Sequence, residues 1–248
     1  MNISPIDHNF SSFYETWLKQ LDIHLQQLVL GHQPNYDSIV ATLITHHKNF
    51  YTAKWAAAHQ DILAFFSPKW ASPLEFSFTW VTGWKPSTVF RLVDSLRKTR
   101  TPLTSLNQLS DEQCKKIKEL GVKIKLEEQR VERELERLQV SMGDLKMVEL
   151  TRLVSRVNED SDESTRINGL VDIALKEKLD GLEKVMKMGD YVRLKTLKCV
   201  LDVFSSRQGV DFLAVFGMIQ IQIRKWGKQR DVLISNNLDV NTNIAYHT

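Results

Sequence analysis

The chain has 248 residues, of which 42% are hydrophobic and 25% charged, and it contains no apolar run near 18 residues. This length allows a substantial buried core, and this polarity excludes a membrane span. A net charge of +3 is too small to indicate nucleic-acid binding by itself. The first ten residues lack the basic start and apolar core of a signal peptide, and two cysteines, Cys114 and Cys199, do not make a disulfide framework. We therefore expect a protein of the nucleus and/or the cytoplasm.

Two long helices are predicted at the start of the chain. After a tail at residues 1–9, apolar residues recur at steps of three and four over residues 10–30, which is the helical period. Gly31 and Pro34 interrupt this pattern. A similar rhythm then predicts a second helix over residues 36–66, ended by Pro68. The apolar positions of the first helix are Phe13, Tyr14, Trp17, Leu18, Leu21, Leu25 and Leu28.

Residues 65–93 contain three Trp, five Phe and three Pro, the densest aromatic stretch of the chain. Pro73 and Pro86 are placed where proline suits the first turn of a helix, so we expect short helices over residues 74–81 and 88–96. The first is expected to be almost fully buried, with Trp80 in the core, and to end at Gly83. The alternative is that some of these aromatic side chains line a pocket for an apolar ligand.

A further long helix is predicted from Ser110, because Gln113 three residues later completes a capping box. Residues 110–140 hold eight acidic and eight basic residues, which is typical of a solvated helix face. Ile117, Ile124 and Val131 repeat every seven residues, but Gly121 and Glu128 interrupt the apolar seam. We therefore favour a helix packed within one bundle over a dimerising zipper.

The remaining segments are also helical in pattern. An acidic stretch at residues 157–165 predicts a mobile loop, followed by helices over residues 167–188 and 190–204, separated near Gly189. A closing helix is expected over residues 208–234, and a disordered tail over residues 236–248. No segment shows convincing strand alternation. The fold class is therefore all-α, a single multi-helix bundle of long antiparallel helices without a sheet.

Catalytic signatures are absent from the sequence. There is no nucleophile elbow, no glycine-rich phosphate loop and no closely spaced set of Cys and His ligands, so we expect neither an enzyme nor a metal site. His46 and His47 are adjacent and point about 100° apart on a helix, which suits a shared metal poorly. The basic residues around Trp226 are interpreted as the end of the last helix, with the tryptophan packed inward, and not as a nucleic-acid site.

Five sequence blocks resemble the plant Delay of Germination (DOG) domain family: residues 65–93 with TGWKPSTVFRLV, LSDEQ at 109–113, KMVEL at 146–150, RLKTLKCVLDV at 193–203 and KWGKQRD at 225–231. They occur in the family's order. The segment at residues 46–68 is similar to the fourth Delay-of-germination-like subfamily. The resemblance implies a DOG-type helical domain over residues 10–235. The domain is shared with TGA-type bZIP factors, but no basic region or zipper precedes it here, so direct DNA binding is not expected.

The resemblance implies a non-enzymatic regulator of seed dormancy, maturation and reserve accumulation under abscisic acid signalling, acting through protein contacts. Implied partners are clade A type-2C protein phosphatases or TGA-type transcription factors. The family's phosphatase-binding motif, Asp-Ser-Tyr-Leu-Glu-Trp, corresponds here to residues 12–17, where Tyr14 and Trp17 match. Two alternatives stay open, a domain that senses a fatty acid or haem, and a pollen-aperture factor of the same domain family.

The candidate partner-binding residues are Phe13, Tyr14 and Trp17, since three large aromatic residues within five positions exceed what one helix face needs for packing. The alternative is that all three belong to the core. A haem-binding relative carries two histidines spaced by four on its last helix. Gln220 and Arg224 occupy those positions here, and neither is a normal axial ligand. We therefore expect no cofactor.

Overall fold

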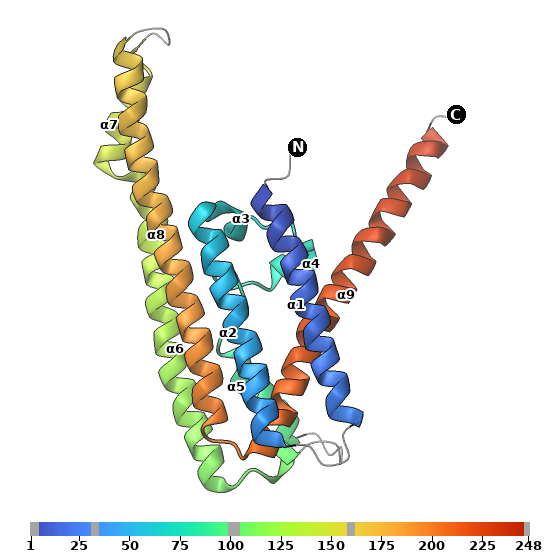
Figure 1. Ribbon diagram of the computed structural model, residues 1–248. Helices are drawn as coiled ribbons and strands as arrows, with labels where there is room; N and C mark the ends of the chain where they lie inside the picture. Colours follow the sequence, from blue (N-terminus) through green and yellow to red (C-terminus); the bar gives the residue numbers. More distant parts are fainter. Residues whose placement is uncertain (1–4, 31–34, 99–104, 158–161, 246–248) are drawn as a thin grey trace.

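The computed structural model describes residues 5–30, 35–98, 105–157 and 162–245 (Figure 1). Within these ranges every named element is a helix, and the one β-bridge is the isolated pair Trp80–Gly83. The expected all-α bundle is thus confirmed. In chain order the elements are α1 (Pro5–Leu30), α2 (Tyr36–Gln60), α3 (Leu63–Phe66), α4 (Pro73–Ser77), α5 (Thr88–Lys98), η1 (Ser105–Gln108), α6 (Asp111–Val140), η2 (Ser141–Gly143), α7 (Leu145–Val154), α8 (Asp162–Leu201) and α9 (Ser206–Ala245).

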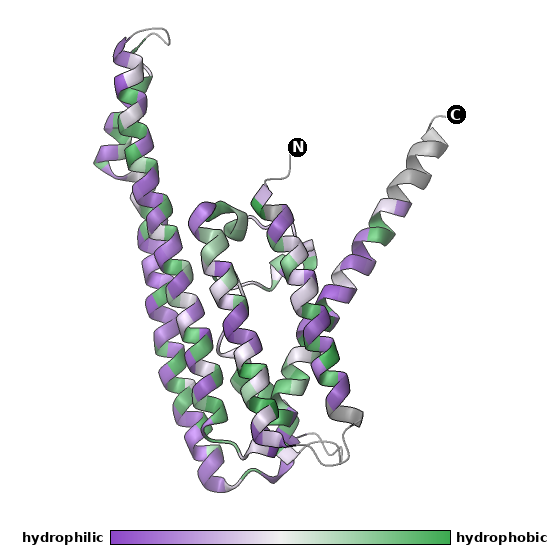
Figure 2. Ribbon diagram, in the orientation of Figure 1, coloured by the Kyte–Doolittle hydropathy of each residue, from purple (hydrophilic) through white to green (hydrophobic). Residues whose placement is uncertain are grey.

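The helices form a body and two projections (Figure 1). Helices α1, α2 and the first half of α9 pack together, while α6 and α8 run side by side as a long pair that carries α7 at its far end. The second half of α9 extends away from the body (Figure 1). Hydrophobic residues gather at the base of the bundle, and hydrophilic residues cover much of α6 (Figure 2).

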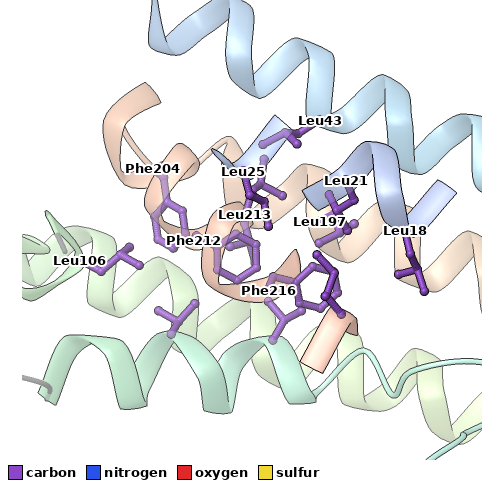
Figure 3. Close-up of a cluster of buried hydrophobic side chains, with 14 of the residues drawn as sticks. Leu18, Leu21, Leu25, Leu43, Leu106, Leu197, Phe204, Phe212, Leu213 and Phe216 are labelled. Carbon is purple, nitrogen blue, oxygen red and sulfur yellow. The ribbon is translucent and has the colours of Figure 1, made fainter. Parts of the chain in front are cut away.

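The main core lies where α1, α2, α8 and α9 converge (Figure 3). Leucines of α1 and α2 contact aromatic residues of α9 here, and the side chains of Leu21 and Phe212 are fully buried. Burying one such side chain contributes about 1.5–3 kcal/mol to folding. The labelled members are Leu18, Leu21, Leu25, Leu43, Leu106, Leu197, Phe204, Phe212, Leu213 and Phe216.

Local signals correctly predict several helix boundaries. At the start of α6, Gln113 N donates to Ser110 Oγ (3.2 Å) and Ser110 N donates to Gln113 Oε1 (3.0 Å), so the capping box is confirmed. A second capping box joins Ser72 and Glu75 at the start of α4, where Pro73 is the first residue, as expected for proline. Helix α6 packs against α8 within the chain, as preferred over a zipper.

Other boundaries differ from the sequence prediction. Helix α1 begins at Pro5, α2 ends at Gln60 before the short α3, and α9 continues to Ala245, past the start of the expected tail. Helix α8 is continuous through Gly189, which is buried; a Cβ atom there would lie 3.3 Å from Arg193 Nη1. A single glycine inside a long helix costs only about 1 kcal/mol, so it need not end the helix. The expected acidic loop falls partly on residues 158–161, outside the described residues, and Asp162 begins α8.

The aromatic stretch differs most from its prediction. Helix α4 ends at Ser77, so the helix expected over residues 74–81 covers only the first part of that range. Phe76 and Phe78 are exposed, Phe78 by 70%, and Trp80 is half-buried. The prediction of an almost fully buried helix is therefore wrong. The physical reason is that the chain reverses direction at residues 80–84 and cannot continue the helix.

Candidate functional site

Residues 80–84 form a tight reversal that we call the inner turn. Trp80 N donates to Gly83 O (2.6 Å), and Gly83 N donates to Trp80 O (3.2 Å). Between them Val81 and Thr82 have φ angles of 43° and 61°. This left-handed conformation is unfavourable for β-branched residues and persists only where the surrounding structure imposes it. The contacts that hold the inner turn are thus the first feature of the site.

Three buried charged residues, Lys54 of α2 with Asp190 and Arg193 of α8, hold the inner turn in place. Arg193 donates through Nε to the carbonyl oxygen of Trp84 (2.7 Å) and through Nη2 to those of Trp80 and Val81. Lys54 Nζ donates to the carbonyl oxygen of Thr82 (3.0 Å) and to its hydroxyl (2.9 Å). The backbone of the turn thus accepts charge-assisted hydrogen bonds from two helices.

Asp190 is the counterion of both cations. Its carboxylate accepts hydrogen bonds from Lys54 Nζ (2.9 Å), Arg193 Nη1 (2.5 Å) and Trp55 Nε1 (3.0 Å). Two cations against one anion leave an excess positive charge, which faces the carbonyl oxygens of the inner turn. Burial, with a contribution from Arg193, lowers the pKa of Lys54 to about 8, although Asp190 acts in the opposite direction. Lys54, Asp190 and Arg193 are called the charge network below.

An aromatic cavity of about 170 Å³ lies beside the charge network. Its walls combine rings from α1, α2 and the inner turn with the network residues themselves. The indole Nε1 of Trp84 donates to the Tyr51 hydroxyl (3.1 Å), which fixes two of these rings relative to each other. The lining includes Tyr14, Trp17, Phe50, Tyr51, Trp70, Trp84 and Gln220.

Two residues that line the cavity each carry a buried polar atom without a hydrogen-bond partner. These atoms are the indole Nε1 of Trp70, a donor, and the side-chain Oε1 of Gln220, an acceptor. Among the described residues these are the two buried side-chain nitrogen or oxygen atoms without a partner. Buried polar groups are normally paired, so each of them requires an explanation.

Arg224 forms a second buried cluster, at the junction of α1, α4 and α9. It is 7% exposed and donates to Glu15 Oε1 through Nη2 (2.6 Å), and through Nη1 to Glu75 Oε2 (2.7 Å) and the Trp70 carbonyl oxygen (2.7 Å). The interpretation of this region as a helix end is wrong, because α9 continues and Trp226 is 54% exposed. The reason is that Arg224 binds carboxylates of two other helices and thereby directs Trp226 outward.

The three predicted partner-binding residues pack into the interior. Trp17 is 5% exposed, its Nε1 donates to the carbonyl oxygen of His46 (3.0 Å), and its ring lies parallel to the His46 ring at 4.7 Å. Tyr14 and Phe13 are half-buried against the core. Tyr14 and Trp17 line the aromatic cavity, and burial raises the pKa of the Tyr14 hydroxyl. This agrees with the core alternative, and partner binding by these residues stays a prediction.

The two positions of the haem histidines lie close together and have different roles here. Gln220 lines the aromatic cavity, whereas Arg224 is occupied by Glu15 and Glu75. The adjacent histidines of α2, His46 and His47, are both buried, and burial lowers the pKa of His47 to about 3. No group of three or more His, Cys, Asp or Glu side chains in the described part of the chain is arranged to hold a metal ion.

Sequence reasoning did not identify the charge network, nor the burial of Glu128. Glu128 is 1% exposed, and its carboxylate accepts a hydrogen bond from the backbone N of Ser87 (2.6 Å) before α5, so its interpretation as a solvated residue is wrong. The sequence does contain a signal that Lys54 is buried. Lys54 lies at helical spacing from the apolar positions Tyr51 and Ala58 and therefore falls on the buried face of α2.

Comparison with known proteins agrees with the sequence resemblance. The DOG1 family model, described as seed dormancy control, matches residues 18–95. Protein DOG1-like 4 of Arabidopsis thaliana is 46% identical over 231 residues, which cover 91% of this chain and 94% of the relative. Protein RESPONSE TO ABA AND SALT 1 of the same plant is 24% identical over 90% of this chain and 96% of its own length.

Similarity also extends to transcription factors. Transcription factor TGA7 of Arabidopsis thaliana is 22% identical over 84% of this chain, but the match covers only 53% of that factor. None of the described helices has a stretch apolar enough, over sufficient length, to span a bilayer. The identity to Protein DOG1-like 4 over nearly the whole of both chains shows that this chain belongs to the DOG1 family of plant regulatory proteins.

Proposed function

We propose that this protein is a non-enzymatic regulator that acts through protein contacts in abscisic-acid-linked seed dormancy, maturation and reserve accumulation. The observation that carries the proposal is the identity of 46% to Protein DOG1-like 4 over 91% of the chain. The family model described as seed dormancy control and a relative named for its response to abscisic acid and salt support it.

The proposed partners are clade A type-2C protein phosphatases or TGA-type transcription factors, in the nucleus or the cytoplasm. Partial similarity to TGA factors supports the second class. In both cases the expected contribution of Tyr14 and Trp17 is indirect, since these rings shape the body from inside. Surface residues of α1 beside them would then make the contact.

The proposal is tested by affinity purification of the full chain from maturing seed tissue, followed by binding assays with the purified partner. Trp17→Ala removes a buried ring and its hydrogen bond to His46, so we expect a loss of about 3–5 kcal/mol in the free energy of unfolding. The affinity of this variant for the partner should fall only in proportion to the fraction of the protein that is unfolded. A folded Trp17→Ala variant with weakened binding would instead make Trp17 a direct contact, and a wild-type chain that recovers neither partner class would contradict the proposal.

The alternative of a fatty acid or haem sensor has weaker support. The aromatic cavity of about 170 Å³ is close in size to the engineered cavity of about 150 Å³ that binds benzene. Haem and long acyl chains are much larger, and either would have to displace the aromatic walls. In addition, neither Gln220 nor Arg224 supplies an axial ligand of the usual kind.

A further inference from the structure

The aromatic cavity has the size and lining of a small-molecule site. Ligand sites are concave and mostly apolar, with a few polar groups that fix the ligand's orientation. Here the rings of Tyr14, Trp17, Phe50 and Trp84 supply the apolar surface. A volume of about 170 Å³ holds a compound of one ring, or two fused rings, without a long chain.

The charged groups in the cavity wall already have partners within the protein. Lys54 and Arg193 share Asp190, their excess positive charge faces the carbonyl oxygens of the inner turn, and Glu75 is paired with Arg224. A charged ligand would therefore lose its hydration without gaining a free counterion, which is unfavourable. This favours a neutral ligand.

The two unpartnered atoms specify the polar group of that ligand. Trp70 Nε1 needs an acceptor and Gln220 Oε1 needs a donor. A hydroxyl group supplies both, because its oxygen accepts a hydrogen bond and its O–H donates one. Such pairing would satisfy the two buried atoms that the protein itself leaves unpaired.

The cavity also has a route to the surface. Phe78 and Thr79 belong to its lining, and both are exposed in the segment between α4 and the inner turn. This segment includes no long helix, so a ligand could enter there with little change to the body. The deeper wall is formed by the charge network and the inner turn.

We propose that the aromatic cavity binds a neutral, planar aromatic compound of one or two rings that carries a hydroxyl group, with Trp70 Nε1 and Gln220 Oε1 as its hydrogen-bond partners. The proposal is independent of how the protein contacts its partners. Bound water could pair the same two atoms, but it would show no preference between aromatic probes.

Phenol and toluene are matched probes, because they have nearly the same size and differ in the hydroxyl group. Titration of the full chain, followed by calorimetry and by tryptophan fluorescence, should show one saturable site for phenol. We expect phenol to bind about tenfold more tightly than toluene, because its hydroxyl makes two hydrogen bonds in the cavity in exchange for those it gives up in water.

Variants test the assigned atoms. Gln220→Met keeps the length of the side chain but removes one of the two hydrogen-bond partners, so the preference for phenol over toluene should shrink to about threefold while toluene affinity is retained. Retained toluene binding also reports an intact cavity. Ala71→Phe, which adds a ring at the cavity wall, should abolish binding of both probes. Gln222→Met at an exposed position of the same helix is the control and should change neither affinity.

Three results would overturn the proposal. The first is the absence of saturable phenol binding up to the solubility limit. The second is equal affinity for phenol and toluene in the wild-type protein, since this would mean that the two polar atoms take no part. The third is unchanged phenol binding in a folded Ala71→Phe variant, because the site would then lie elsewhere.

Discussion

Replacing Asp190 with asparagine removes one negative charge from the charge network and changes the shape of the side chain very little. Lys54 and Arg193 would then lie buried together without a counterion, and Trp55 Nε1 would lose a charged acceptor. Removing one partner of a buried ion pair typically costs 3–5 kcal/mol. We expect Asp190→Asn to reduce the free energy of unfolding by about this amount.

The two cations contribute differently to this loss. The buried lysine can escape the repulsion by losing its proton, since burial already lowers its pKa to about 8. At pH 7 this deprotonation costs about 1.4 kcal/mol. Arginine stays protonated in proteins, so most of the expected loss comes from Arg193 and from the charged acceptor that Trp55 Nε1 loses.

Thermal unfolding followed by circular dichroism at pH 7 measures the effect. For a chain of this size, 1 kcal/mol shifts the melting temperature by about 2–4 °C, so Asp190→Asn should melt roughly 6–20 °C below the wild type. Asp172→Asn, at an exposed position of the same helix, is the control and should change the melting temperature by less than about 2 °C.

A double-mutant cycle separates charge from packing. Lys54→Met removes one of the two cations, so the variant that combines it with Asp190→Asn should lose less stability than the sum of the single variants. Asp190→Asn melting within about 2 °C of the wild type, or strictly additive losses in the cycle, would refute the view that Asp190 acts as the counterion of the network.

Three further predictions follow from burial and close packing. Because the pKa of buried His47 is about 3, against about 6.5 when unfolded, the unfolded state takes up a proton below pH 6.5 that the folded state does not, and stability should fall by about 2 kcal/mol between pH 7 and pH 5. Denaturant titrations should show a smaller fall for His47→Gln and an unchanged fall for the exposed control His8→Gln; equal slopes in all three proteins would contradict this. Gly227→Ala should destabilise the protein by at least about 1 kcal/mol, because a Cβ atom there would overlap Ser72 Oγ, whereas Gly169→Ala, with no neighbour within 4 Å, should stabilise it by up to about 1 kcal/mol. A Gly227→Ala variant at least as stable as the wild type would show that the α4–α9 contact is not tight. Haem titration should give no saturable Soret band, because positions 220 and 224 lack histidine, and saturation at one haem per chain would disprove this.

The long helices could be predicted from the sequence because their signals are local. The spacing of Trp17, Leu18, Leu21 and Leu25 defines the buried face of α1, and the capping box of Ser110 defines the start of α6. These signals depend on residues a few positions apart. They therefore appear in the sequence without knowledge of what each helix packs against.

The inner turn could not be predicted in the same way. Val81 and Thr82 are poor residues for a left-handed conformation, so local propensity argues against a turn at this place. The turn is stabilised by Lys54 and Arg193, which lie 28 and 112 residues away from the carbonyl oxygens of Thr82 and Val81 that they bind. The helix break expected near Gly189 is wrong for a related reason, since the close neighbour of this glycine is Arg193 Nη1, which is close to it only in the folded protein.

The charge network and the aromatic cavity share one wall. An ion pair in a protein interior can often be replaced by apolar side chains without loss of stability. This does not hold for Arg193, because its guanidinium also pairs three carbonyl oxygens of the inner turn that an apolar side chain would leave unsatisfied. Thr82, Gly83 and Trp84 of the same turn line the cavity. The buried charges are therefore best explained as the means by which this chain keeps the inner turn, and with it one wall of the cavity, in a single conformation.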